Sequence, residues 1–257
     1  MGILNVTPDS FSDGGRFSGF DQAVRQAEQM VAEGAAVIDI GGQSTRPGFA
    51  EITEAEEIDR VVPVIRELLT RVSVPLSIDT YKPAVARAAL EAGAHLLNDV
   101  HGLQRSPELA ALAAGFGAPV VAMHWDPAFR AWTGDTLAGL RSYVDRTVDI
   151  AVRAGLGADR LVLDPGIGFA KTQAQNLELV RRLDEVRRWG FPVLLGASRK
   201  SFIGAVLAQP EPQDRLEGTL ATTAVAAWHG VEILRVHDVA ANLRVARMTT
   251  AIRGLPL

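Results

Sequence analysis

The stretch PLSIDTYKPAVARAALEAGAHLLND (residues 75–99) holds two short apolar runs separated by a segment with helical periodicity. The runs PLSID (75–79) and HLLND (95–99) are typical of strands buried on both faces of a parallel sheet. The segment between them begins with Pro83 and stops at Gly93, as expected for a helix with proline in its first turn and glycine after its last. This stretch therefore predicts a strand–helix–strand unit.

The same alternation extends along the whole chain. Further apolar runs occur at GILNV (2–6), AVIDI (36–40), PVVAM (119–123), RLVLD (160–164), PVLLG (192–196) and EILRV (232–236). Two of the intervening helical stripes comprise Ala23, Val24, Ala27, Met30 and Val31, and then Ile58, Val61, Val62, Ile65 and Leu68. The first stripe stops at Gly34, and Pro63 within the second predicts a kink.

Eight strands in strict alternation with helices predict an α/β fold, a (β/α)8 TIM barrel that forms a single domain over residues 1–257. A doubly wound open sheet is the alternative, because the sequence does not show whether the ring of strands closes.

Composition excludes several classes of protein. The net charge of −4 and the pI near 5.8 argue against a nucleic-acid or membrane-surface partner, since both need a basic excess. The absence of cysteine excludes disulfides, thiolate nucleophiles and cysteine–zinc sites, and it fits a cytoplasmic location. No run of about 18 apolar residues predicts a membrane span, and the N-terminus lacks the pattern of a secretory signal.

Polar residues end the predicted strands. In chain order these are Asn5, Asp39, Asp79, Asn98, His124, Asp164, Ser198 and His237, the last preceded by Arg235 and Val236. The carboxyl ends of barrel strands lie on one rim, where active sites assemble. Each residue alone could instead cap the following helix. Six or seven of them on one rim favour a site.

Three of these residues, Asp79, Asn98 and Asp164, offer hydrogen-bond acceptors and donors to the barrel mouth. A carboxylate can accept two parallel N–H bonds from an amidine-like edge, such as that of a 2-amino-4-oxopyrimidine ring. The set therefore predicts a small heterocyclic ligand without deciding which one.

Two basic stretches predict anion binding. GASRKSFIG (196–204) reads as a strand end, a turn with Lys200, and a helix start at Ser201, and a helix start beside a cation attracts a carboxylate or phosphate. An exposed basic turn is the alternative. In RVHD (235–238), alternation directs Arg235 and His237 to the same side, which suits a diphosphate better than a core.

The remaining loops are less specific. GGQSTRPG (41–48), taken alone, reads as a loop with a surface arginine, and DPGIGFAKT (164–172) joins a strand end to a glycine-rich turn. No P-loop, GxGxxG or HExxH pattern occurs. A metal, if used, should be a hard ion such as Mg²⁺, held mainly by substrate phosphates and one side-chain oxygen.

Taken together, the motifs resemble those of the dihydropteroate synthase family. The resemblance rests on NVTPDSFSDGG (5–15), DIGGQSTRPG (39–48), SIDT (77–80), NDV (98–100), DPGIGFAKT (164–172), GASRKSFIG (196–204) and RVHDV (235–239). It implies a barrel that is usually a homodimer, a transferase of folate biosynthesis and a target of sulfonamides. The implied reaction joins 4-aminobenzoate to 6-hydroxymethyl-7,8-dihydropterin diphosphate, giving 7,8-dihydropteroate and pyrophosphate.

The resemblance also implies a role for each matching residue. The pterin would be held by Asp79, Asn98, Asp164 and Lys200; the diphosphate by Asn5, Arg235 and His237, with Asn5 also a ligand of Mg²⁺; and the aminobenzoate side by Phe11, Thr45, Arg46, Pro47, Phe169 and Ser201. The expected catalytic set is Asp13, Lys200, Arg235 and His237. The chain departs from the family at Gln43 (usually Glu), at His101 (usually Ser or Thr) and over HWDPAFRAW (124–132), where His-Met-x-Gly-x-Pro is usual.

The implied chemistry is dissociative: the C–O bond breaks first, and the aryl amine then captures the pterin-stabilised cation. Fixed charges must stabilise this charge separation, and we expect Asp13 to face the cation from a closing loop over residues 7–15. A methyltransferase module that presents methyltetrahydrofolate to a corrinoid protein is one alternative, and a non-catalytic pterin-binding or phosphate-binding protein is another.

Overall fold

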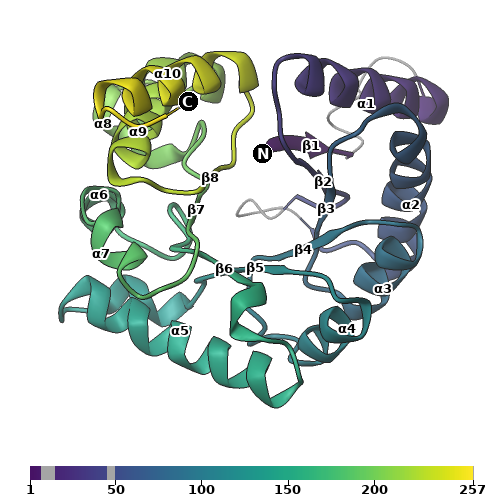
Figure 1. Cartoon of the computed structure of the whole chain (residues 1–257), viewed down its shortest axis with the longest axis horizontal. Coiled ribbons are helices and arrows are strands. Elements are labelled where there is room, and N and C mark those ends of the chain that lie inside the picture. The colour runs from purple at the N-terminus through teal and green to yellow at the C-terminus, as the bar shows by residue number, and fades with distance from the viewer. Residues whose placement is uncertain (7–14, 45–49, 257) are drawn as a thin grey trace.

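The described strands form a closed ring in the computed structural model, which describes residues 1–6, 15–44 and 50–256 (Figure 1). Six parallel strands are hydrogen bonded in chain order: β1 (Gly2–Asn5), β2 (Ile38–Gly41), β3 (Leu76–Asp79), β4 (Leu96–Asp99), β5 (Val120–Met123) and β6 (Leu161–Asp164). The last two, β7 (Leu194–Leu195) and β8 (Ile233–Leu234), pair with each other.

Two bridges complete the ring. Leu163 pairs with Val193 between β6 and β7, and Gly2 pairs with Val236 beyond the end of β8. At the second junction the Ile3 amide donates to the Val236 carbonyl at 3.0 Å. Closure distinguishes a (β/α)8 barrel from the open sheet, so the predicted fold class is confirmed.

The strands of the last two units are shorter than their apolar runs predicted. The runs cover 192–196 and 232–236, but each strand has two residues. One cause is visible at Val193, whose amide donates to the Glu232 carboxylate at 2.9 Å instead of to a neighbouring strand. A side chain has replaced one backbone bond of the ladder.

Helices surround the ring (Figure 1). They are α1 (Gly15–Ala32), α2 (Glu54–Arg71), α3 (Pro83–Glu91), α4 (Glu108–Phe116), α5 (Thr136–Arg153), α6 (Gln173–Arg181), α7 (Leu183–Arg187), α8 (Ser201–Leu207), α9 (Leu216–His229) and α10 (Val239–Ile252). The connections after β6 and β7 hold two helices each. The largest core cluster lies between strands and helices and includes Leu4, Ile38, Ile65, Ile78 and Leu97.

The unit predicted from residues 75–99 is present as β3, α3 and β4. Proline stands in the first turn of α3, and Gly93 after the helix has φ +107, where a Cβ would lie 2.5 Å from Leu69 Cδ1. Glycine is therefore required there by conformation and by space. Helix α2 continues through Pro63, which lies on its exposed face.

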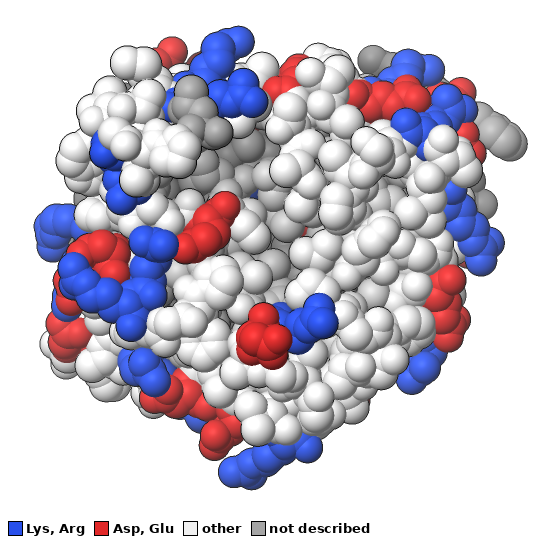
Figure 2. All heavy atoms as spheres, in the orientation of Figure 1, with Lys and Arg blue, Asp and Glu red and all other residues white. Residues whose placement is uncertain are grey.

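Most charged side chains lie around the margin of the face drawn in Figure 2 and a few lie nearer its middle, with Lys and Arg interspersed among Asp and Glu. This face has no broad region of one sign, which agrees with the near-neutral composition. None of the helices in the described part of the chain combines the length and apolar character needed to cross a membrane.

Candidate active site

Sheet register places the polar ends of neighbouring strands in one row. Asn5 pairs with Gly41, Gly41 with Asp79, and Asp79 with Asn98. Since Gly41 has no side chain, its neighbours occupy the space above it: Asp79 Oδ2 and Asn5 Oδ1 lie 3.8 and 3.9 Å from where its Cβ would be. Three of the predicted site residues therefore lie together on the carboxyl-terminal rim.

Arg235 lies between two carboxylates of this rim. Its Nε donates to Asp39 Oδ2 at 2.6 Å and its Nη2 donates to Asp79 Oδ2 at 2.7 Å. Asn98 Nδ2 donates to the same Asp39 oxygen at 2.9 Å. Asp39 is fully buried and orients both partners. The sequence predicted it at a strand end without a role in the site, but β2 continues to Gly41 and Asp39 is its second residue, two positions before the row.

Burial and charge shift the titration of this group. The pKa of Asp79 is raised to about 7, mainly by burial; Arg235 opposes this shift and the Asp39 carboxylate contributes to it. Burial would lower the pKa of Arg235, but the attraction of Asp39 and Asp79 outweighs it, and the net shift is upward. The guanidinium stays charged while Asp79 can change its charge near neutral pH. Asp79 Oδ1 is buried and has no hydrogen-bond partner among the described residues.

A second group lies across the mouth, around Asp164. Its Oδ1 accepts from the Gly166 amide at 2.7 Å. Asp164 Oδ2 and Lys200 Nζ lie 3.6 and 3.9 Å from where a Cβ on Gly196 would be, so the two charges share the space over β7. Lys200 also donates to the Ile167 carbonyl and lies 4.5 Å from the centre of the Phe169 ring.

Burial acts on both charges of this second group. It raises the pKa of the Asp164 carboxyl despite the nearby Lys200 ammonium. It lowers the pKa of Lys200 to about 8, although Asp164 favours the charged form. Each partner therefore favours the charged form of the other and opposes the effect of burial.

Only some residues of the segment 196–204 lie at the rim. Ser198 Oγ lies 2.9 Å from His237 Nδ1, which orients that imidazole on the rim. Ser201 begins α8 and is exposed. Arg199 is directed elsewhere, because it forms an ion pair with Asp238 at 2.6 Å. Its φ of +59 is a left-handed conformation, and its amide donates to Thr219 Oγ1 at 3.0 Å.

Five predicted residues, Phe11, Asp13, Thr45, Arg46 and Pro47, lie outside the described part of the chain. Their expected roles stay predictions. No group of three or more His, Cys, Asp or Glu side chains suited to a metal occurs in the described ranges. Asn5 and Asp79 still present hard oxygen donors side by side over Gly41, a set that fits Mg²⁺ supplemented by phosphate oxygens.

Sequence reasoning missed a buried pair beneath Phe169. Lys171 Nζ lies 2.9 Å from His124 Nδ1 and donates to the carbonyls of Gly166 and Phe169 at 2.9 and 3.2 Å. Burial lowers the pKa of Lys171 to about 7 and that of His124 to about 2, so the imidazole is neutral. The pair ties the loop after β6 to the end of β5. The sequence signals were a lysine in a glycine-rich turn and His124 at a predicted strand end.

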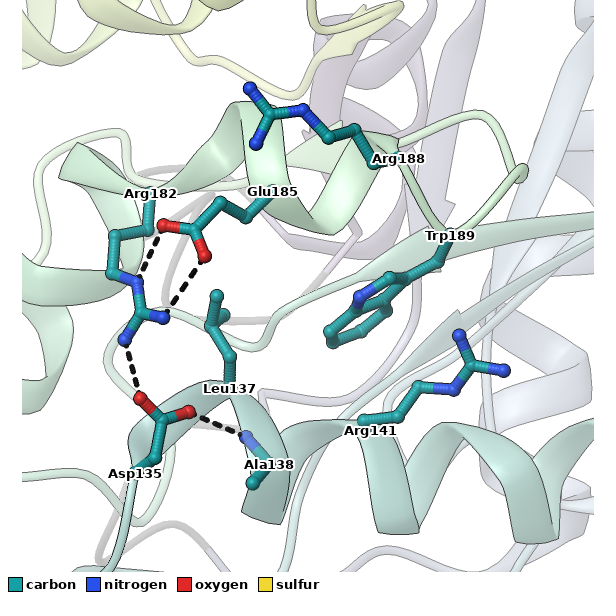
Figure 3. A pocket seen from close by; sticks show the side chains of 8 residues that line it. All are labelled: Asp135, Leu137, Ala138, Arg141, Arg182, Glu185, Arg188 and Trp189. Atoms are coloured by element: carbon teal, nitrogen blue, oxygen red, sulfur yellow. Dashed lines mark hydrogen bonds and ion pairs between the residues drawn. The ribbon is translucent and has the colours of Figure 1, made fainter.

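A hollow on the outer surface lies apart from this rim, between the start of α5 and the segment 182–189 that includes α7 (Figure 3). It measures about 370 Å³ and contains Arg141, Arg182, Arg188 and Trp189. Arg182 binds Asp135 and Glu185, while Arg141 and Arg188 pair with Asp145 and Asp184. None of the predicted site residues that the structure describes lines this hollow.

Comparison with known proteins agrees with the geometry. The model of the family described as "Pterin binding enzyme" matches residues 1–237. The dihydropteroate synthase of Synechocystis sp. is 47% identical over 98% of this chain and 89% of its own length. That of Bacillus subtilis is 47% identical over 98% and 87%. This chain belongs to the dihydropteroate synthase family. The family is one of transferases, so the chain is an enzyme of that class.

Solved structures of the family superpose closely. The synthase of Clostridium difficile, determined in the presence of pteroic acid, gives a TM-score of 0.94 at 47% identity, covering 98% of this chain and 95% of that one. The Yersinia pestis enzyme in complex with a sulfonamide drug gives 0.91 at 43%, covering 99% and 93%. The Xanthomonas albilineans enzyme with 4-aminobenzoic acid gives 0.94 at 41%, covering 100% and 93%. These matches do not favour the methyltransferase alternative.

Proposed function

We propose that this chain condenses 6-hydroxymethyl-7,8-dihydropterin diphosphate with 4-aminobenzoate to form 7,8-dihydropteroate and pyrophosphate. The observation that carries the proposal is the rim itself. It brings buried acceptors, an amide and two cations together at the barrel mouth, in a family with members solved in the presence of pteroic acid and with 4-aminobenzoic acid.

The pterin would bind between the two groups of the rim. Asp79 Oδ1 is a buried acceptor that no described residue uses, and a bicyclic amidine edge would supply the missing donors. Asn98 is held by Asp39 and offers an amide oxygen. Asp164 and Lys200 would contact the opposite edge of the ring, because both reach the space over Gly196.

The diphosphate would lie at Asn5, Arg235 and His237. Arg235 is oriented by two carboxylates and His237 by Ser198, so both donors are fixed before the substrate arrives. Asn5 would hold Mg²⁺, which when bound would supply Lewis-acid neutralisation of the phosphate charge.

The aminobenzoate would lie beside Phe169, with its carboxylate near Ser201 and with Phe11, Thr45, Arg46 and Pro47 around it. The C–O bond to the diphosphate would break before the aryl amine attacks. The carboxylates of Asp79 and Asp164 would favour the cationic ring, while Arg235 and His237 would stabilise the departing anion. Asp13 would face the cation, so Asp13→Ala should lower kcat while pterin diphosphate binding stays unchanged.

The chain would act in the cytoplasm as a homodimer and would be inhibited by sulfonamides, as a drug complex of a relative suggests. Neighbouring helices support a second copy as partner. They expose the large apolar side chains of Val206 on α8, Trp228 on α9, and Met248 and Ile252 on α10. Exposed apolar side chains of this size are typical of surfaces that a permanent interface covers.

The activity is tested by pyrophosphate release. We expect release when the purified protein receives both substrates with Mg²⁺, and none when either substrate is omitted. Release without 4-aminobenzoate would indicate a hydrolase, and binding of the pterin without release would indicate a carrier protein. Either result would contradict the proposal.

A further inference from the structure

Two positions at which the chain departs from the usual family motifs lie against each other. The rings of His101 and Trp125 are stacked, with centroids 4.3 Å apart and planes at 8°. His101 follows β4 and Trp125 follows β5, so the stack joins neighbouring strand ends on the rim of the site. The two departures therefore form one structural feature.

The third departure, Gln43, is connected to this stack through Tyr81. The edge of Tyr81 packs on His101 with centroids 5.1 Å apart. The Tyr81 hydroxyl donates to Glu51 at 2.7 Å and accepts from Gln43 Nε2 at 2.8 Å. Glutamate at position 43, the usual family residue, could not donate that bond, because an ionised carboxylate only accepts. Gln43, His101 and Trp125 are thus linked through Tyr81.

On its other side the stack contacts a predicted site residue. The rings of Trp125 and Phe169 have centroids 5.3 Å apart at 52°. Lys171 donates to the backbone carbonyl of Phe169 and so fixes its backbone, while Trp125 packs against its ring. That ring in turn carries Lys200 Nζ, 4.5 Å from its centre, beside Asp164.

We propose that His101 and Trp125 are positioning residues for the pterin pocket. Their stack fixes the ring of Phe169, and through it the ammonium of Lys200, and so sets the affinity for the pterin diphosphate. This inference rests on the proposed function. A flat indole has few rotamers, whereas the methionine usual in the family is flexible and would let Phe169 turn.

The test compares Trp125→Met, His101→Ser and the double variant, which restore residues usual in the family. At saturating 4-aminobenzoate, Trp125→Met should raise KM for the pterin diphosphate roughly three- to tenfold, the size of one aromatic contact. The kcat should stay within about twofold, because no group that touches the reacting atoms is lost. Since the two residues act as one stack, the double variant should raise KM by less than the product of the single effects.

Two matched variants separate positioning from general stability. Trp125→Phe keeps a ring against Phe169 and should keep KM within about twofold of the wild type. Trp132 lies in the same segment, is 46% exposed, and uses its indole N–H on the Asp135 carbonyl rather than in the stack. Trp132→Met should leave KM unchanged. If Trp125→Met did not fold, His101→Ser alone would be expected to show the same increase in KM.

The possible failures are distinguishable. A wild-type protein that makes no dihydropteroate would overturn the proposed function and this inference with it. If the wild type is active but Trp125→Met and Trp132→Met have the same KM for the pterin diphosphate, this inference alone is overturned. The inference would also be overturned if the double variant raised KM by the full product of the two single effects. A lower melting temperature for Trp125→Met without a change in KM would overturn it too.

Discussion

Asp39 accepts hydrogen bonds from Arg235, 196 positions later in the chain, and from Asn98, 59 positions later. The sequence predicted that Asp39 ends a strand, whereas in the structure it is the second residue of β2, which runs on to Gly41. The sequence does not show that two other site residues converge on one of its oxygens. That convergence depends on ring closure and side-chain rotamers, which local patterns do not encode.

Removing the Asp39 carboxylate should destabilise the fold. Asp39→Leu leaves Arg235 with Asp79 as its only described acidic partner, and breaking a buried pair on one side costs on the order of 3 kcal/mol. Asp145→Leu is the matched control, because its pair with Arg141 is exposed and should contribute less than about 1 kcal/mol. Urea unfolding measures both free energies, and equal losses would contradict the assigned role of Asp39.

The rim also predicts a pH profile. Asp79, with its pKa raised to about 7, is ionised above that pH, and Lys200, with its pKa lowered to about 8, is protonated below that pH. The value of kcat/KM should therefore fall on the alkaline side as Lys200 loses its proton. Lys200→Arg keeps its charge and should move that limb upward. An alkaline limb at the same pH in both proteins would assign it to another group.

At the scale of elements, the loop between β6 and α6 shows what sequence patterns miss. The motif DPGIGFAKT predicted a turn at a strand end, and the structure confirms that turn. The pattern did not show that Lys171 lies inside the turn and binds two of its carbonyls, because a lysine usually predicts a solvated side chain. Similarly, the amide of Val193, just before the two-residue strand β7, donates to the Glu232 side chain, and the apolar run does not reveal that bond.

Gly166 tests the fit of this loop. It has φ +67, and a Cβ there would lie 2.0 Å from the carbonyl oxygen of His124. Gly166→Ala should therefore cost roughly 3 kcal/mol or more, since backbone must move in addition to the strain at positive φ. Gly155 has φ +82 with open space around it, so Gly155→Ala should cost only about 1 kcal/mol. Equal losses of unfolding free energy for Gly166→Ala and Gly155→Ala in chemical unfolding would show that the loop is not closely packed against the end of β5.

On the scale of the whole molecule, alternation of strand and helix predicted the barrel, and the bridges to β1 and β6 confirm it. The row of polar strand ends followed from topology alone, which is why the sequence placed Asp79, Asn98, Asp164 and Arg235 on one rim correctly. Arg199 shows the limit of such reasoning: its basic turn suggested an anion site, but Asp238 neutralises it. The single domain and the dimer stay predictions.

The exposed apolar side chains on α9 and α10 predict a dimer of twice the 27.5 kDa chain mass. Met248→Glu combined with Ile252→Glu should shift the sedimentation equilibrium toward the monomer, because two buried carboxylates would face an apolar partner. The same pair of changes at Leu69 and Val152, exposed apolar residues on α2 and α5, should leave the mass unchanged. A wild-type protein that sediments as a monomer would contradict the prediction.

We propose that the carboxyl-terminal rim of this barrel makes dihydropteroate. The most direct measurement follows dihydropteroate and pyrophosphate together, by mass spectrometry and phosphate detection, in the wild type and in Asp79→Ala. We expect equal amounts of the two products from the wild type. In the variant, the loss of a buried hydrogen-bonding acceptor should lower kcat/KM by roughly a hundredfold or more. A wild type without product, or a variant as active as the wild type, would show that the rim does not carry this activity.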